Sequence, residues 1–502
     1  MLRPLTKTLR AWPVSALTLL AALAVLVPAP ARAAPAATEP TRQTAAGSTG
    51  AQPARVLRLE SVEITGAFKT RPTVIRRLLG LSPGDALTPA SLAAARGRLL
   101  ASGYFRSVNV STRPGAERGD VVLVLDLRER HLPYLDTGFG WRDPEGWYLN
   151  VIGLRAENPL GLGGRATAGA RLGFRTAGSE AELFLPLTAD RRLALRLRVG
   201  RAEEQALWYQ YEPGWQGLYD EHRLKLDRLR TLAALEWRPR PELRLSVGFA
   251  GQSVDPREEA ENRDTDQDVP FADLPDFLHA EPDRLHLHGL QLGLMLGRGG
   301  MDGRPGASLH LAGTLVRRGL GADRDYARVT AALRATVALP AGRSLALGLR
   351  AGAAGGDAPW YERFRLGGSY SVRGFRDHSL SPLAGHRRFW TASAELRFPL
   401  IGAVAPAEPE PRTLWRLELP RRREARLTGV LFLDAGQGWA EESDLDPLDA
   451  EVDFGALNLG AGYGVRLRLP WVGIVGMDVG MPVTAGVTGE AAWVTLTLGH
   501  SF

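Results

Sequence analysis

The chain of 502 residues contains no cysteine, and only Lys7, Lys69 and Lys225 among its 62 basic residues are lysines. The absence of cysteine excludes a disulfide framework, a thiolate metal site and a cysteine-linked lipid anchor. The net charge of +7 is carried almost entirely by arginine, and basic residues do not alternate with aromatic ones as in a stacking platform for bases. We therefore expect no nucleic-acid partner.

Long apolar runs are also scarce, and the one long stretch lies near the start, over residues 11–27. It follows a basic start, contains Pro13 and is followed by Ala31-Arg32-Ala33, a small-residue cleavage site. This order is typical of a secretory signal peptide. An uncleaved transmembrane helix fits less well, because the stretch is short for a span of about 20 residues. We therefore predict a signal peptide at 1–33.

Residues 34–54 are rich in Ala, Pro, Thr and Gly without periodicity, which predicts a flexible linker. Residues 55–130 then predict a small α+β unit. Within it, Thr88 and Pro89 provide the N-cap and first residue of a helix. The expected order is a strand that ends at Gly66, a helix over 71–79, a helix from Thr88 to Gly103, and strands at 105–112 and 121–127.

From residue 131 to residue 502 the sequence changes to short alternating stretches separated by turn residues. Barrel strands of about 9–11 residues joined by alternately short and long connections produce this pattern. It predicts an antiparallel transmembrane β-barrel of sixteen strands. The expected strands lie near residues 134–142, 147–157, 165–175, 180–186, 192–205, 224–237, 243–251, 285–297, 306–317, 326–338, 344–352, 389–399, 427–434, 457–468, 473–481 and 491–502.

An even number of strands places both ends of the barrel on the same side of the membrane. Because the small α+β unit precedes the first strand, that side is the periplasm of an exported protein. The long segments 252–284 and 353–388 then become extracellular loops. Segment 401–426 is long for a periplasmic turn, and two interpretations stay open for it: an insertion that contacts a partner, or a solvated loop.

The final segment alternates to its last residue, with Leu498, His500 and Phe502 on one face. Such alternation suits a strand with one apolar and one polar face. A chain that ends on an aromatic residue within such a strand resembles bacterial outer-membrane barrels, in which this ending serves as the signal for barrel closure. The alternative is an edge strand of a soluble sandwich.

Three short motifs stand out within the expected barrel. Segment 353–388 contains Val372-Arg373-Gly374-Phe375, the next strand contains Glu395, and the strand after that contains Phe432-Leu433-Asp434-Ala435-Gly436. Arginine presents a planar fork of donors that matches carboxylates, so one such residue can fix the tip of a loop. Glycine beside it permits a sharp turn of the backbone.

These motifs resemble those of the BamA/TamA family of outer-membrane proteins, bacterial surface antigens that combine polypeptide-transport-associated (POTRA) domains with a β-barrel. The stretches "VEITGAFKT", "GDALTPASL" and "LLASGYFRSVNV" of the α+β unit resemble a POTRA domain. The resemblance implies that segment 353–388 folds into the lumen. It also implies that Arg373 pairs with Asp434 near Glu395, with Gly374, Phe375 and Gly436 as further residues of the loop latch.

The resemblance implies a function in outer-membrane protein assembly, insertion or translocation, in which unfolded clients are captured by β-strand addition. The expected partners are unfolded outer-membrane or secreted polypeptides, outer-membrane lipids, and periplasmic or lipoprotein partners. We expect no enzymatic activity, cofactor or metal. The alternative is a transport pore for a small solute or for a secreted partner protein.

Two features bear on the mechanism. Gly138 and Gly140 in the first strand and Gly499 in the last predict weak pairing where the barrel closes, or else they only relieve crowding there. The chain also has a single POTRA-like unit, whereas the family's dedicated assembly proteins carry several. This difference leaves the full assembly function an open expectation.

Overall fold

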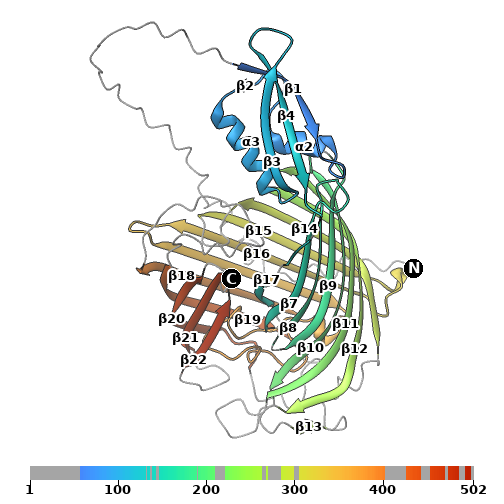
Figure 1. The fold of residues 1–502 in the computed structure, drawn as a ribbon. Coiled ribbons are helices and arrows are strands. Elements are labelled where there is room, and N and C mark those ends of the chain that lie inside the picture. Colours follow the sequence, from blue (N-terminus) through green and yellow to red (C-terminus); the bar gives the residue numbers. More distant parts are fainter. Residues whose placement is uncertain are drawn as a thin grey trace.

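The computed structural model describes two connected parts, a small N-terminal domain and a barrel (Figure 1). The segments predicted as signal peptide and linker lie outside the described residues. No helix among the described residues has both the length and the apolar character needed to cross a membrane. The described residues are 57–131, 133–135, 138–142, 146–173, 175–188, 190–209, 221–262, 267–269, 284–298, 305–401, 426–441, 453–469, 473–484 and 492–498.

The N-terminal domain has a four-stranded sheet of order β2-β1-β4-β3, in which β1 and β4 are parallel and the other pairs antiparallel. Two helices complete it. The elements are β1 (Leu57–Thr65), α2 (Pro72–Leu79), β2 (Ala86–Leu87), α3 (Pro89–Ala101), β3 (Phe105–Pro114) and β4 (Asp120–Glu129). Apart from β2, whose two residues are too few to produce a sequence pattern, each element lies where the sequence predicts it.

The core of this domain is the apolar layer between the sheet and the helices. Ile75 and Leu79 of α2 and Leu99 of α3 are fully buried against Leu123 and Leu125 of β4. Thr88 caps α3 in a reciprocal pair with Ser91, so the first free amides of the helix have partners. Strand β3 is left at the edge of the sheet with one side unpaired within the domain.

The barrel is a closed antiparallel ring of sixteen strands, in which β5 and β6 together form the first strand and β13 is a short extension that pairs with β12. The strands are β5 (Tyr134–Leu135), β6 (Gly138–Arg142), β7 (Gly146–Glu157), β8 (Arg165–Gly173), β9 (Thr176–Pro186), β10 (Leu193–Tyr209), β11 (Glu221–Arg240), β12 (Leu243–Asn262), β13 (Gln267–Val269), β14 (Leu285–Arg298), β15 (Gly306–Val316), β16 (Tyr326–Ala338), β17 (Ser344–Gly356), β18 (Arg388–Ile401), β19 (Arg426–Trp439), β20 (Asn458–Leu469), β21 (Gly473–Pro482) and β22 (Trp493–Leu498).

The two faces of each strand differ as the alternating sequence predicts. On β10, Leu197 and Val199 are exposed on the outer face. Arg196 and Arg198, which alternate with them, form ion pairs with Glu182 of β9, at 2.5 and 2.6 Å. The apolar face therefore meets lipid, and charged side chains neutralise one another on the lumen side.

Strands β10, β11 and β12 are longer than the sequence predicts, with 17, 20 and 20 residues. The predicted loop 252–284 begins as the continuation of β12 and its pairing with β13. The difference has a physical reason, because beyond the membrane both faces of a strand meet water and the alternation that marks a strand is lost. The extensions over residues 206–209, 221–223 and 252–262 lie opposite the turns that face the N-terminal domain, and β11 also extends over 238–240 at its other end.

The N-terminal domain contacts the turns at one end of the barrel (Figure 1). The backbone amide of Arg71 donates to the carbonyl of Gly161, in the turn between β7 and β8, at 3.1 Å. The hydroxyl of Tyr104 donates to the carbonyl of Gly163 at 3.0 Å, and the hydroxyl of Tyr134 to that of Gly103 at 3.0 Å. The domain is thus hydrogen-bonded directly to the barrel rather than joined to it by the chain alone.

Candidate functional site: a loop inside the barrel

The connection between β17 and β18, residues 357–387, folds back into the lumen. Its apolar side chains are buried in one cluster with side chains of the barrel wall. Trp360, Phe364 and Phe375 of the connection are at most 5% exposed. The cluster also includes Leu224 and Leu226 of β11, Val254 of β12, Leu285 and Leu287 of β14, Tyr326 of β16 and Phe389 of β18. A hydrophobic core therefore fills this part of a barrel that is otherwise polar inside.

The tip of this loop is Arg373, whose side chain is almost fully buried. Its Nε and Nη2 atoms donate to the two oxygens of Asp434 on β19, at 2.6 and 2.8 Å. Its Nη1 atom donates to Glu395 on β18 at 2.6 Å. The backbone amide of Arg373 also donates to Asp434, at 3.1 Å. The guanidinium lies over the ring of Phe432, 3.7 Å from its centroid.

The charges around this arginine balance. Asp478 on β21 lies 3.5 Å from Nη1 of Arg373 and accepts two hydrogen bonds from Arg466, at 2.6 and 2.8 Å. Glu395 also pairs with Arg397, at 2.6 Å. Three arginines thus face three carboxylates, all of them buried. Such a network tolerates burial only when every member has a partner, so the removal of one charge leaves others uncompensated.

The backbone at the loop tip lies on a floor of glycines. Gly374 has a φ of +97°, and a Cβ on it would lie 2.8 Å from the backbone of Met481 on β21. A Cβ on Gly480 would lie 2.6 Å from the amide nitrogen of Gly374, and one on Gly436 2.5 Å from Val372. A Cβ on Gly460 of β20 would overlap the carbonyl of Arg373. The wall therefore admits the loop only where side chains are absent.

The structure brings together the residues that the sequence singled out for this loop: Arg373, Gly374, Glu395, Asp434 and Gly436. Phe375 lies in the apolar cluster beside them. That these contacts act as a latch stays a prediction. The sequence analysis missed Ser393, Arg397, Gly460, Arg466, Asp478 and Gly480. Glycines at alternate positions of β20, namely 460, 462 and 464, are the signal that marks a wall approached by another backbone.

The other sequence-predicted residues are less fully described. His500 and Phe502 lie outside the described residues, and of Leu498 only the backbone is described, paired with Val475 of β21. Residues 402–425, most of the expected insertion, also lie outside them. Among the described residues, no group of three or more His, Cys, Asp or Glu side chains is arranged to hold a metal ion.

The first and last strands are the place where the ring closes, with β22 next to β5 in the order of the sheet. The described part of β22 has six residues, β5 has two and β6 five. Residues 136–137, 143–145 and 499–502 of this part of the ring lie outside the described residues. The weak pairing expected at the seam therefore stays a prediction.

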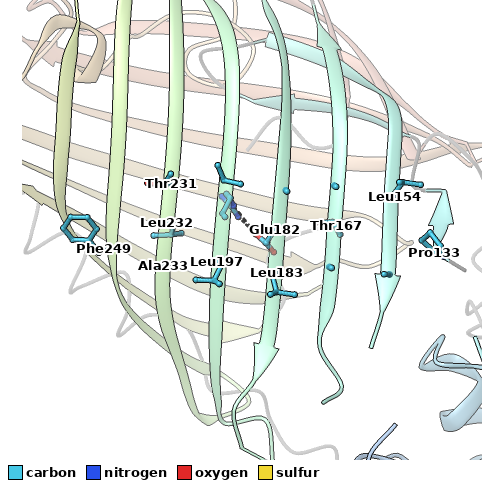
Figure 2. A pocket seen from close by; sticks show the side chains of 16 residues that line it. Pro133, Leu154, Thr167, Glu182, Leu183, Leu197, Thr231, Leu232, Ala233 and Phe249 are labelled. Carbon is cyan, nitrogen blue, oxygen red and sulfur yellow. Dashed lines mark hydrogen bonds and ion pairs between the residues drawn. The ribbon is translucent and has the colours of Figure 1, made fainter. Parts of the chain in front are cut away.

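A shallow groove of about 730 Å³ crosses the outer wall from β7 to β12 (Figure 2). Leu154, Leu183, Leu197 and Phe249 border it, as Figure 2 shows. Alanines, among them Ala156, Ala168 and Ala181, form its floor. The groove belongs to the face that meets lipid.

A plugged barrel with a small α+β domain hydrogen-bonded to one end defines a class of outer-membrane proteins. The model of the Omp85 superfamily domain matches residues 158–502, and a POTRA model, described as a surface antigen variable number repeat, matches residues 57–130. The chain belongs to the Omp85 superfamily. It is an outer-membrane protein with a periplasmic POTRA domain, as the sequence predicts.

The chain is also similar to individual proteins. The outer membrane protein assembly factor BamA of Neisseria meningitidis is 31% identical over 113 residues, which are 22% of this chain and 14% of that protein. The match thus spans a small part of that relative's length. The crystal structure of BamA from Haemophilus ducreyi lacking POTRA domains 1–3 superposes with a TM-score of 0.63 at 15% identity, covering 88% of this chain and 84% of that one. CdiB from Escherichia coli gives a TM-score of 0.48 at 14% identity, covering 91% and 92%.

Proposed function

We propose that this protein inserts polypeptides into the outer membrane or moves them across it, and that it has no enzymatic activity. The observation that carries the proposal is the lumen filled by residues 357–387. A filled lumen is unsuited to steady passage of solutes. Gly138, Gly140 and Gly499 predict weak pairing where the first and last strands meet, and such a seam is suited to opening sideways and presenting strand edges to a client.

In this proposal the client arrives as an unfolded outer-membrane or secreted chain and first meets the POTRA domain. Strand β3 offers an edge with unpaired backbone groups, to which an extended segment can add as a further strand. The domain's hydrogen bonds to the turns after β7 hold that edge close to the barrel. Capture and delivery are thereby coupled through a fixed distance. Periplasmic or lipoprotein partners and outer-membrane lipids complete the proposed set of partners.

The arginine network is proposed to set the position of the loop. Its charges balance within the buried cluster, so its net contribution to stability is expected to be modest, while its geometry is well defined. Arg373 reaches β18 and β19 directly and β21 at 3.5 Å, so it spans strands near the closing end of the ring. Movement of the loop tip is then coupled to the strands next to the seam.

Planar-bilayer conductance of the purified protein tests the proposal, with wild type beside Arg373→Ala. We expect a small, flickering wild-type conductance and a several-fold larger one in the variant, because the variant leaves Glu395 and Asp434 buried without their partner. Arg192→Ala, which removes an exposed arginine in the turn after β9, is the matched control and is expected to behave as wild type.

A large and steady conductance in wild type and both variants would contradict the proposal and favour a transport pore for solutes. Release of a secreted partner protein from cells, abolished by deletion of this protein while outer-membrane proteins assemble normally, would narrow the proposal to translocation.

A further inference from the structure

Phe68, in the connection between β1 and α2, is the most exposed large apolar side chain among the described residues, at 95%. A phenylalanine on a soluble domain is seldom left in water to this extent unless it has a partner. The same connection carries Lys69, one of only three lysines in the chain. We therefore expect the ring of Phe68 to have a partner.

The connection that bears Phe68 is held rigidly. The buried carboxylate of Glu129, at the end of β4, accepts hydrogen bonds from the backbone amides of Phe68, Lys69 and Thr70, at 3.0, 2.8 and 2.6 Å. The Thr70 hydroxyl accepts from Asn158 of the barrel turn at 2.8 Å. Because the backbone is fixed on both sides, the exposure of Phe68 is built into the fold rather than the result of a loose loop.

The barrel turn beside this connection presents a second apolar side chain. Leu160 is 57% exposed. Its neighbour Gly161 lies against the backbone of Lys69, and the carbonyl of Gly161 accepts a hydrogen bond from the backbone amide of Arg71. This turn directly follows β7, whose Ile152 and Leu154 are exposed on the lipid-facing side. Phe68 and Leu160 thus lie where the apolar surface of the barrel ends at the periplasmic side.

The charges near this position are mainly basic. Lys69 follows Phe68, its backbone lies against Gly161, and its Nζ atom donates to the carbonyl of Arg130 at 3.5 Å. Arg191 and Arg192 lie in the next turn. Of the nearby carboxylates, Glu129 is occupied by backbone amides, Asp190 pairs with Arg192, and Glu157 pairs with Arg155. An aromatic side chain with basic neighbours at this depth has the composition of a membrane-interface anchor.

We propose that Phe68 and Leu160 form a lipid-contacting anchor that inserts into the headgroup region of the periplasmic leaflet, with Lys69 beside phospholipid phosphates. The anchor would fix the POTRA domain against the membrane surface in addition to its hydrogen bonds to the barrel. The turn that bears Leu160 continues the lipid-facing surface of β7, so the expected occupant is a lipid and not a polypeptide. Burial of the ring also gives it the apolar surroundings that the fold itself does not provide.

The absence of cysteine makes a direct test available in the full-length protein. Phe68→Cys, labelled with an environment-sensitive fluorophore, is placed in phosphatidylethanolamine–phosphatidylglycerol vesicles with and without lipids that carry a nitroxide near the headgroup. Glu117→Cys, in the exposed turn between β3 and β4, carries the same label as the matched control. Heat-modifiable migration confirms that both barrels are folded. Leu160→Cys provides an independent second position.

We expect quenching of at least twofold at positions 68 and 160 and none at 117. Equal quenching at all three positions, or none at 68 and 160, would overturn the proposal. Emission at 68 that is insensitive to nitroxide lipids but shifts on addition of an unfolded polypeptide would also overturn it, and would assign Phe68 to client binding.

Discussion

At the scale of single residues, the glycines beneath the loop tip matter as much as the charges above them. Gly460 has no side chain, and the carbonyl of Arg373 occupies the space where a Cβ would be. The loop can lie there only because two backbones are allowed to approach closely. The position of the loop tip is therefore set both by the arginine network and by the shape of the barrel wall.

This arrangement gives a prediction that leaves every charge unchanged. Gly460→Ala should displace the loop tip, at a cost of about 1–3 kcal/mol for overpacking, which raises the population of the displaced loop by roughly 5- to 150-fold. Single-channel recordings should show more frequent openings. Gly313→Ala on β15, where a Cβ has only one neighbour at 3.9 Å, is the control and should record as wild type. Equal behaviour of the two variants would contradict the role of the glycine floor.

A second residue-scale prediction concerns Glu129 and pH. Burial opposes its ionisation, but hydrogen bonds from Thr70, Lys69 and Phe68 outweigh this effect and hold its pKa below the ordinary value of 4.5. A carboxylate with a lowered pKa contributes stability above pH 4.5, and this contribution is lost as the pH falls through its folded-state pKa. Hydrogen-exchange protection of residues 68–70, corrected for intrinsic rates, should therefore decrease below pH 4.5.

Glu129→Gln should lose this protection already at pH 7, because an amide presents a donor to backbone N–H groups where the carboxylate offered two acceptors. The loss should amount to about 1.5–3 kcal/mol for hydrogen bonds to a charged group. Glu117→Gln, in the exposed turn, serves as the control. Protection that is unchanged in Glu129→Gln would show that the connection is held by its other contacts.

The sequence predicted the arginine, the two carboxylates on β18 and β19, and the glycines 374 and 436. It did so because they occur in recognisable motifs. Asp478 and Arg466 do not belong to such a motif, and a single aspartate in a strand does not indicate a particular role. Their role depends on β20 and β21 standing next to β19 in the ring, which only the register of the barrel establishes.

At the scale of secondary-structure elements, β3 leaves backbone groups unpaired that neighbouring strands elsewhere use. β3 is an edge of the domain sheet, and its outer residues, such as Asn109 and Ser111, are exposed. Exposed polar residues on an edge prevent uncontrolled association without blocking the backbone.

Strand addition at β3 predicts a specific cross-linking pattern. A photoreactive amino acid at Ser111 should capture unfolded outer-membrane polypeptides several-fold more often than the same group at Ala94, which is also exposed but lies on α3. Mass spectrometry of the adducts measures the ratio. Capture at Ala94 that equals or exceeds capture at Ser111 would place client binding on the helical face of the domain instead.

At the scale of the whole molecule, charge is unevenly distributed around the lumen. On β9, β10 and β11 the carboxylates of Glu182, Glu204 and Glu236 are all in ion pairs with arginines. On β12, β16 and β17 the inward positions include Arg244, Arg328, Arg334 and Arg350. The lumen therefore has an excess of positive charge along one wall.

A barrel whose loop has been released should consequently prefer anions. In the Arg373→Ala variant, the reversal potential in a potassium chloride gradient should shift toward the chloride equilibrium potential. Arg334→Gln added to that variant should reduce the shift. A reversal potential on the potassium side would contradict the expected influence of the arginine-lined wall.

Most of the fold followed from the sequence because alternation and turn residues act locally. Each of the sixteen barrel strands overlaps its predicted range, and α3 begins at its expected cap. Three features escaped prediction: the two-residue strand β2, the extracellular parts of β10 to β12, and the docking of the domain on the turn after β7. Each depends on contacts between distant segments or on strands surrounded by water, where alternation carries no information.

The unequal strand lengths give the barrel a mouth that is cut at a slant. The 20 residues of β11 extend over roughly 65 Å, whereas about 9–11 residues suffice to cross the membrane. The surplus stands beyond the outer leaflet as a curved screen, whereas β15 has 11 residues and β16 has 13. A polypeptide that emerges from the lumen therefore meets a high wall at β10 to β12 and a lower one at β15 and β16.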